Sequence, residues 1–226
     1  NNTEKVMLSD LIGYEIQKKK LVDNTEAFIQ GKKANNVLLF GDSGTGKSSS
    51  IKAIMNEYYD RGLRMIEVYK HQFQDLSAII NQIKDRNYKF IIFMDDLSFE
   101  EFEIEYKYLK AIIEGGLEKR PDNVLIYATS NRRHLVKETW ADRDTDDINR
   151  RDNMEETLSL SDRFGLAVCF SSPAKNDYVN IVLELAKEKG PKFDENDLDV
   201  KAEAFALSRG GRSQRCAKQF VESLFC

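Results

Sequence analysis

The chain has 226 residues, 41% of them apolar and 32% charged, which fits a globular protein with one large domain or one domain and a small appendage. Its 34 basic residues nearly balance 38 acidic ones, and the net charge of −4 argues against a general polyanion binder. No stretch approaches the roughly 18 uninterrupted apolar residues of a membrane span, and three cysteines without C-x-x-C spacing indicate reduced thiols, so we expect a cytoplasmic protein without a membrane segment.

The first predicted helix covers about residues 14–30, because apolar side chains recur there every seven residues and Gly31 follows as a stop signal. The apolar run 36–40 then predicts a buried strand, and the apolar stripe of residues 51–58 predicts a second helix. A strand followed by a helix is the setting that a phosphate-binding loop needs.

Between this strand and helix lies Gly41-Asp42-Ser43-Gly44-Thr45-Gly46-Lys47-Ser48, which fits the pattern G-x-x-x-x-G-K-[ST]. Glycines let the backbone turn tightly and approach phosphates, and the N–H groups of the loop and the helix start form a nest for anions. Lys47 would reach the β- and γ-phosphates of a nucleotide, and the Ser48 hydroxyl would bind Mg²⁺. The alternative is a glycine-rich turn that happens to precede Lys-Ser; the flanking strand and helix favour the nucleotide site.

The second informative stretch is residues 89–96, an apolar strand that ends in Asp95 and Asp96. A strand that is apolar on both faces belongs in the middle of a parallel sheet covered by helices, and acids at its carboxyl end lie where such sheets bind ligands. Asp95 would then hold Mg²⁺ and Asp96 would polarise the attacking water. The alternative is a pair of exposed acids at the start of a loop.

The remaining elements follow from further apolar runs and helical stripes. Strands are predicted at 63–68, 123–129 and 166–170, and helices over 73–83, 102–113, 178–189, 198–206 and 213–225. The charged stretch 140–153 is predicted to be an exposed, mobile loop. Strands that alternate with helices predict an α/β domain over residues 1–173, and helices alone predict a smaller helical domain over residues 174–226.

The order of these motifs resembles that of the AAA+ ATPase superfamily over almost the whole chain. The phosphate loop matches the Walker A motif, and residues 91–96 match the Walker B motif. Asn131 matches sensor 1, Arg163 matches the arginine finger, and residues 210–215 resemble sensor 2. The resemblance implies an α/β fold, a three-layer α/β/α sandwich with a five-stranded parallel sheet of order 5-1-4-3-2, and a helical lid from about residue 174.

The resemblance also implies the site residues, with ATP and Mg²⁺ as cofactors. Catalysis is expected of Asp96, Asn131 and Arg163, and Mg²⁺ binding of Ser48 and Asp95. Sensor 2 is Arg212 or Arg215; we favour Arg215, which lies in the first turn of the last helix, and a structural ion pair is the alternative for either. Nucleotide binding is expected of Ile12, Tyr14, Gly41, Asp42, Ser43, Gly44, Thr45, Gly46, Lys47, Ser48, Ser49, Arg212 and Arg215.

More narrowly, the strings at 41–49, 95–100 and 158–165 resemble a bacterial AAA+ group known as domain of unknown function 815. Many AAA+ enzymes end Walker B in Asp-Glu, whereas this chain has Asp95-Asp96, as initiator and helicase-loader proteins do. The shorter Asp96 lies one methylene further from a water, which argues against fast turnover.

Three functions fit these motifs. The first is a Mg²⁺-dependent ATPase that moves a partner or its own assembly, and the second is a nucleotide-dependent switch or loader with negligible hydrolysis. The third, a small-molecule kinase, is less favoured because residues 174–226 resemble a lid rather than an acceptor-binding domain. The resemblance implies a homo-oligomer in which Arg163 acts in trans, with a protein partner. Basic clusters at 132–137 and 150–151 are surrounded by acids, so a nucleic-acid role rests on fold analogy alone.

Overall fold

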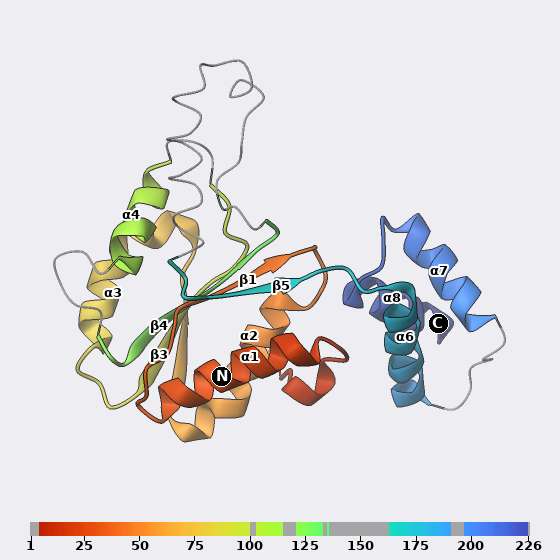
Figure 1. Cartoon of the computed structure of the whole chain (residues 1–226), viewed down its shortest axis with the longest axis horizontal. Coiled ribbons are helices and arrows are strands. Elements are labelled where there is room, and N and C mark those ends of the chain that lie inside the picture. The colour runs from red at the N-terminus through yellow and green to blue at the C-terminus, as the bar shows by residue number, and fades with distance from the viewer. Residues whose placement is uncertain are drawn as a thin grey trace, which may run out of the picture.

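The computed structural model describes residues 5–99, 103–114, 121–132, 135, 163–190 and 197–225. In these ranges five strands form one parallel sheet in the order β2-β3-β4-β1-β5 (Figure 1). Counted from the other edge this order is 5-1-4-3-2, so the predicted sheet is confirmed. The strands are β1 (Val37–Gly41), β2 (Leu63–Glu67), β3 (Lys89–Met94), β4 (Val124–Ser130) and β5 (Leu166–Phe170).

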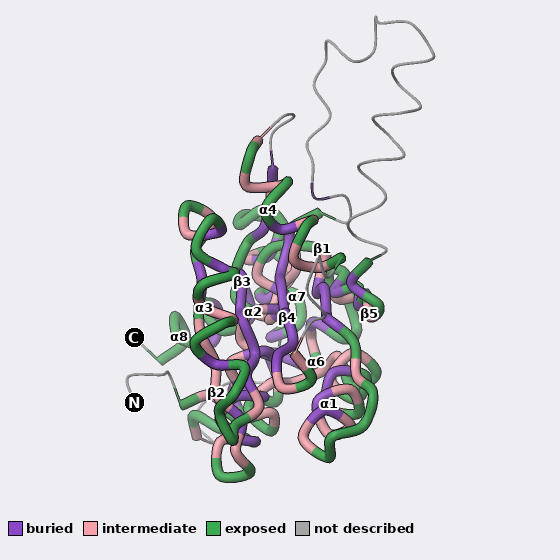
Figure 2. Tube along the Cα trace, turned by 90° about the vertical axis from the view of Figure 1, so that its left-hand side faces the viewer, coloured by how far each residue is buried: buried purple, intermediate pink, exposed green. Residues whose placement is uncertain are grey.

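Burial along the strands follows their places in the sheet. Every residue of β4 is buried, as is every residue of β3 after Lys89, because both strands lie in the interior of the sheet and are covered on both faces (Figure 2). At the sheet edge, β5 alternates between less and more buried residues. Cys169, predicted inside an apolar strand, does lie in β5, but its edge position leaves it exposed.

Helices cover both faces of the sheet, which gives the predicted three layers (Figure 1). Ile91 and Phe93 of β3 belong to the same apolar cluster as residues of α1 and α2. Ile92 and Met94 belong to the cluster that α3 and α4 complete. Side chains alternate across a strand, so one uninterrupted apolar run serves both layers. The helices of these layers are α1 (Glu15–Ile29), α2 (Lys47–Tyr58), α3 (Leu76–Ile83) and α4 (Ile104–Ile113).

The helix predicted over 73–83 differs from the structure at its start. The segment Lys70–Asp75 is a 3₁₀ helix, η3, and the α-helix α3 begins only at Leu76. Phe73 and Leu76 are both buried, and their spacing of three aligns side chains in a 3₁₀ helix too. The apolar stripe therefore located the buried face but could not distinguish the two helix types. Two shorter 3₁₀ helices are η1 (Leu8–Asp10) and η2 (Tyr59–Arg61).

The C-terminal helices pack on one another beside the sheet (Figure 1). Their apolar cluster includes Tyr178, Val182, Ala202 and Ala217 and is separate from the two clusters of the sheet. The helical lid is thus present, and the boundary between residues 173 and 174 remains a prediction. Leu224 lies in the stretch 213–225 that was predicted to be helical, and it is 38% exposed because it is the last residue of its helix. The lid helices are α6 (Lys175–Lys189), α7 (Leu198–Ser208) and α8 (Gln214–Leu224).

Some predictions fall outside the described residues. They include the loop at 140–153, the basic cluster at 150–151, and residues 158–162 of the string at 158–165. Within the described ranges, no helix has the length and apolar character needed to cross a lipid bilayer.

Candidate functional site

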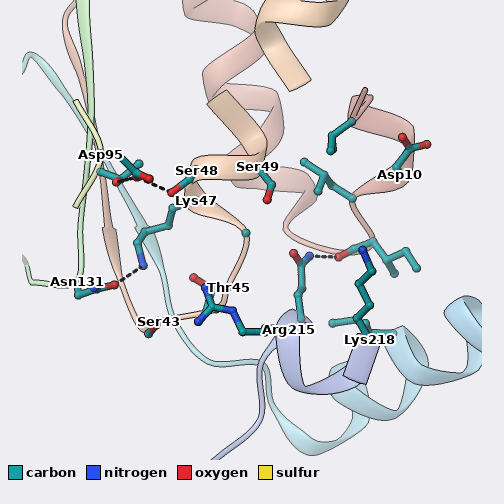
Figure 3. A pocket seen from close by; sticks show the side chains of 18 of the residues that line it. Asp10, Ser43, Thr45, Lys47, Ser48, Ser49, Asp95, Asn131, Arg215 and Lys218 are labelled. Atoms are coloured by element: carbon teal, nitrogen blue, oxygen red, sulfur yellow. Dashed lines mark hydrogen bonds between the residues drawn. The ribbon is translucent and has the colours of Figure 1, made fainter. Parts of the chain in front are cut away.

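A cavity of about 780 Å³ lies where the phosphate loop and the carboxyl ends of β3 and β4 face the lid (Figure 3). This volume is within the range of small-molecule and cofactor sites, roughly 300–1,000 Å³. The N-terminal segment closes one side of the cavity with Val6, Leu11 and Ile12, and α6 contributes Ile181 and Leu185. The cavity therefore has an apolar part beside a strongly polar one.

The phosphate loop joins β1 to α2. Gly44 and Gly46 have φ angles of +76° and +90°, which residues with a Cβ rarely adopt. Gly46 is the N-cap of α2, and the helix starts at Lys47, so the first N–H groups of the helix face the loop. Thr45 Oγ1 donates a hydrogen bond to the Asp42 carbonyl at 2.8 Å, which closes the turn. The segment has the backbone shape that an anion nest requires.

Lys47 is buried, with 6% of its surface exposed. Its ammonium donates to the carbonyl oxygens of Gly41 at 2.9 Å and Asp42 at 2.6 Å, and to Asn131 Oδ1 at 3.1 Å (Figure 3). Burial lowers the pKa of Lys47, and the nearby carboxylates of Asp42, Asp96 and Asp95 oppose that shift. A desolvated cation at this position would gain from a polyanionic ligand.

Ser48 and Thr129 both donate to one carboxylate oxygen of Asp95. Ser48 Oγ donates to Asp95 Oδ1 at 2.6 Å (Figure 3). Thr129 Oγ1 donates to the same oxygen at 2.5 Å. The hydroxyl and the carboxylate are oxygen donors of the kind that Mg²⁺ prefers. The described residues contain no cluster of three or more His, Cys, Asp or Glu suited to a metal, so an ion here would rely on phosphate and water for its other ligands, as Mg²⁺ commonly does.

Asp96 and Asn131 extend the same set of contacts. Asn131 Nδ2 donates to Asp96 Oδ1 at 2.7 Å, and the Asp96 N–H donates to Thr129 Oγ1 at 2.8 Å. Asp96 has φ of +51°, a left-handed conformation that Asp tolerates better than most residues. These contacts form a continuous set, which we call the polar network: Lys47, Ser48, Asp95, Asp96, Thr129 and Asn131.

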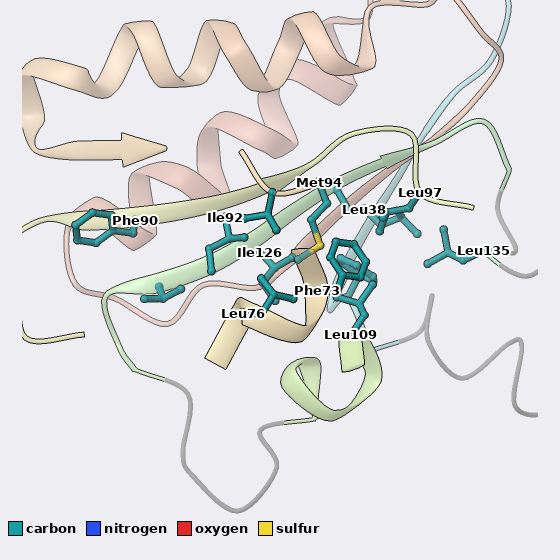
Figure 4. Packing of buried hydrophobic residues seen from close by; sticks show 14 of the residues in the cluster. Leu38, Phe73, Leu76, Phe90, Ile92, Met94, Leu97, Leu109, Ile126 and Leu135 are labelled. Atoms are coloured by element: carbon teal, nitrogen blue, oxygen red, sulfur yellow. The ribbon is translucent and has the colours of Figure 1, made fainter. Parts of the chain in front are cut away.

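Apolar packing holds the strands that carry the polar network. Met94, the residue before Asp95, packs in a cluster with Leu38 of β1 and Ile126 of β4 (Figure 4). The Leu97 N–H donates to the Thr129 carbonyl at 2.7 Å, which ties the segment after β3 to the end of β4. The carboxylates therefore sit on a close-packed base, the kind of rigid support that site geometry needs.

Tyr14, Gly41 and Asp42 lie outside the cavity lining and support the loop instead. Tyr14 stacks on Phe170 with ring centroids 5.0 Å apart and donates to the Ser171 carbonyl at 2.6 Å; burial and the Asp42 charge raise its pKa to about 12. A Cβ at Gly41 would collide with the Phe170 carbonyl. Asp42 accepts a hydrogen bond from the Ser172 N–H at 2.6 Å, which holds the pKa of Asp42 below its usual value.

A sequence profile described as "Protein of unknown function (DUF815)" matches residues 1–226. The chain belongs to this family. No curated protein gives a significant match.

Solved AAA+ ATPases share the fold of this DUF815 protein. A point mutant of RuvB from Thermotoga maritima superposes with a TM-score of 0.65 at 19% identity, over 96% of this chain and 64% of that one. T. maritima RuvB described as a Holliday junction branch migration motor superposes with a TM-score of 0.55 at 16% identity, over 97% of this chain and 72% of that one. Aeropyrum pernix Orc1 in complex with DNA superposes with a TM-score of 0.62 at 16% identity, over 92% of this chain and 58% of that one. The chain thus spans less than two thirds of the first and third of these, and it has the nucleotide-binding AAA+ fold.

The three arginines expected from the AAA+ resemblance have different environments. Arg215 lines the cavity. Arg212 does not; its guanidinium donates to both carboxylate oxygens of Glu203, each at 2.7 Å. Arg163, just before β5, forms an ion pair with Glu114 at the end of α4 and is partly exposed. The geometry favours Arg215 over Arg212 as sensor 2, and the role of each arginine remains a prediction.

Several residues that line the cavity were not expected from the sequence, and they include the polar residues Thr129, Gln214 and Lys218. Thr129 had a usable signal, because residues two apart in a strand face the same side and Thr129 lies two before Asn131. Gln214 and Lys218 lie near Arg215 on α8, and only the docking of the lid shows that they line the cavity. Of the expected residues, the structure brings Ile12, Ser43, Gly44, Thr45, Gly46, Lys47, Ser48, Ser49, Asp95, Asp96, Asn131 and Arg215 to the cavity.

Proposed function

We propose that this DUF815 protein is a Mg²⁺-dependent ATPase of the AAA+ type, which couples ATP binding and hydrolysis to a conformational change of a partner or of its own assembly. The polar network carries the proposal. It joins the buried cation Lys47 to the carboxylates Asp95 and Asp96 through Asn131 and Thr129, beside a glycine-rich loop and a cavity of about 780 Å³.

Lys47 and the loop would bind the phosphates. The ammonium would exchange its contacts with the Gly41 and Asp42 carbonyls for phosphate oxygens, and the first N–H groups of α2 would hold others. Ser48 and Asp95 would hold Mg²⁺, which when bound neutralises charge on the β- and γ-phosphates. The apolar side chains of Ile12 and of α6 would cover the base.

Asp96 and Asn131 would serve hydrolysis. The Asp96 carboxylate would accept a proton from, or orient, the attacking water, and Asn131 is placed to hold Asp96 while its Oδ1 contacts Lys47. Arg163 would act in the site of a neighbouring copy in a homo-oligomer, where a guanidinium stabilises charge on the transferred phosphoryl group. To do so Arg163 would leave Glu114, an exchange that partial exposure of both side chains permits.

The second candidate is a nucleotide-dependent switch or loader with negligible hydrolysis. It is favoured by Asp96, which is shorter than Glu and whose Oδ1 already accepts a hydrogen bond from Asn131. A kinase is less supported, because α6 to α8 form a lid with its own cluster. Orc1 binds DNA in its solved complex. In this chain, Arg132 is the one basic residue of the clusters at 132–137 and 150–151 that lies within the described ranges, so the proposal does not include binding of nucleic acid.

Phosphate release from ATP, with no acceptor added, tests the proposal and separates the two candidates. We expect turnover that requires Mg²⁺, prefers ATP to GTP, and rises per subunit with protein concentration because the site needs a neighbour. ATP binding without release of phosphate at any protein concentration would favour the switch. Transfer of phosphate to a metabolite would revive the kinase.

A further inference from the structure

Gln214, the first residue of α8, reaches two other segments of the protein. Its Nε2 donates to the Ile12 carbonyl of the N-terminal segment at 2.6 Å. On the other side, a Cβ added at Gly46 would collide with Gln214 Oε1, so the amide also lies against the phosphate loop. This one side chain therefore spans the cavity between the N-terminal segment and the loop, and it lines that cavity.

The residues beside Gln214 fix the start of α8 on the loop. The Arg215 N–H donates to the Gly44 carbonyl at 3.1 Å. Ser213, the N-cap, accepts from the Cys216 N–H at 3.1 Å, and a Cβ added at Gly44 would press against its side chain. Because the backbone is held on both sides of Gln214, the reach of its side chain to Ile12 is set by the docked position of the lid.

A nucleotide has its base and its phosphates at opposite ends. With the phosphates on the loop and the base beside Ile12, the ribose that joins them must pass the segment that the Gln214 amide spans. The exocyclic amine of the base would also approach the carbonyl that now accepts from Gln214. The ligand would thus compete with the Gln214–Ile12 hydrogen bond for the same space.

We propose that Gln214 is a latch residue: its hydrogen bond to Ile12 holds the lid against the N-terminal segment, and nucleotide binding breaks that bond. This inference rests on the proposed nucleotide site and adds the residue that controls entry to it. The latch lowers apparent affinity, because part of the binding free energy is spent on breaking a native contact. Removing the amide should therefore strengthen binding, the opposite of what removal of a ligand contact does.

The test measures binding of a fluorescent ATP analogue with Mg²⁺ to the parent and to Gln214→Ala. The worth of one neutral hydrogen bond predicts a Kd roughly two- to tenfold lower in the variant, with faster association in stopped flow. Gln214→Met keeps the length of the side chain without the amide and should shift in the same direction. Gln17→Ala is the matched control, because the Gln17 amide also donates to a backbone carbonyl, that of Cys169 at 3.1 Å, away from the cavity; its Kd should equal that of the parent.

Each other outcome counts against the latch. Weaker binding in both Gln214 variants would make the residue a direct contact of the nucleotide, and an unchanged Kd would make it a static tie of the lid. Tighter binding in Gln17→Ala as well would indicate general loosening. If the parent itself fails to bind the analogue, the proposed nucleotide site is wrong, a result distinct from failure of the latch.

Discussion

Thr129 connects the Asp95 carboxylate to the backbone N–H of Asp96, and Thr129→Val removes that connection with little change of shape. Thr129 is 2% exposed. The substitution leaves the Asp96 N–H without its acceptor. It also removes the shorter of the two hydrogen bonds that Asp95 Oδ1 accepts, and leaves the one from the Ser48 hydroxyl at 2.6 Å. Buried polar groups left unpaired cost about 1–3 kcal/mol, so we expect the free energy of unfolding to fall by about that amount.

The effect on turnover should exceed the effect on binding. Without the Thr129 hydroxyl, the Asp95 carboxylate and the Asp96 backbone lose the side chain that contacts both of them. A small misplacement of reacting groups lowers rates by up to about 10²-fold. Steady-state phosphate release should show a kcat lowered by roughly 10- to 10²-fold, with a smaller change in the Kd of nucleotide measured without Mg²⁺. Urea unfolding monitors stability in parallel. Thr129→Ser keeps the hydroxyl and should recover most of the rate.

Ser130→Ala provides the matched control. Ser130 is the adjacent buried residue, and its hydroxyl donates to the Leu97 carbonyl at 2.7 Å. Neighbouring strand residues face opposite sides of a sheet, so loss of this hydroxyl should lower stability without the same loss of rate. Parental kcat in Thr129→Val, or an equal loss of kcat in Ser130→Ala, would refute the role assigned to Thr129.

Three further predictions follow from the same site and fold. Asp96→Asn should bind ATP like the parent and hydrolyse it about 10²-fold more slowly, because an amide is a poor base; parental phosphate release would place the base elsewhere. Arg163→Ala should bind ATP normally and lose about 10³-fold in rate, and mixing it with Lys47→Ala should restore some activity, whereas no recovery in co-assembled mixtures would count against action in trans. Glu26 pairs with Arg61, whose hydrogen bonds lower the pKa of Glu26 from 4.5 to about 2. The pair therefore stabilises the fold above about pH 4.5, and this contribution is lost as the pH falls toward 2. Glu26→Gln should flatten that part of a stability–pH curve, and an unchanged curve would show that the pair contributes nothing.

The sequence predicted those parts of the site that depend on local spacing. The phosphate loop is one continuous stretch, so its glycines, Lys47 and Ser48 could be assigned from their order alone. Asp95 and Asp96 were found because they end an apolar run, and parallel strands bring their carboxyl ends to one edge of the sheet.

Contacts between distant segments could not be predicted in this way. The pairing of Arg212 with Glu203 depends on how α7 and α8 pack, and no spacing in the sequence encodes it. The reach of Gln214 to Ile12 joins residues 202 positions apart and depends on where the lid docks. Tyr14 was expected to bind the nucleotide, and this role remains a prediction; its backbone is left-handed, with φ of +57°, and its ring stacks on Phe170.

The central claim is that a nucleotide binds in the cavity through Lys47, and binding of a fluorescent ATP analogue to Lys47→Ala tests it most directly. Charge-assisted hydrogen bonds are worth roughly 1.5–3 kcal/mol each, so the account predicts a Kd at least about tenfold higher than in the parent. Lys70→Ala is the matched control, since the Lys70 ammonium also donates to a backbone carbonyl, that of Ser98 at 3.0 Å, and does not line the cavity. An unchanged Kd in Lys47→Ala, or an equal rise in Lys70→Ala, would contradict the account.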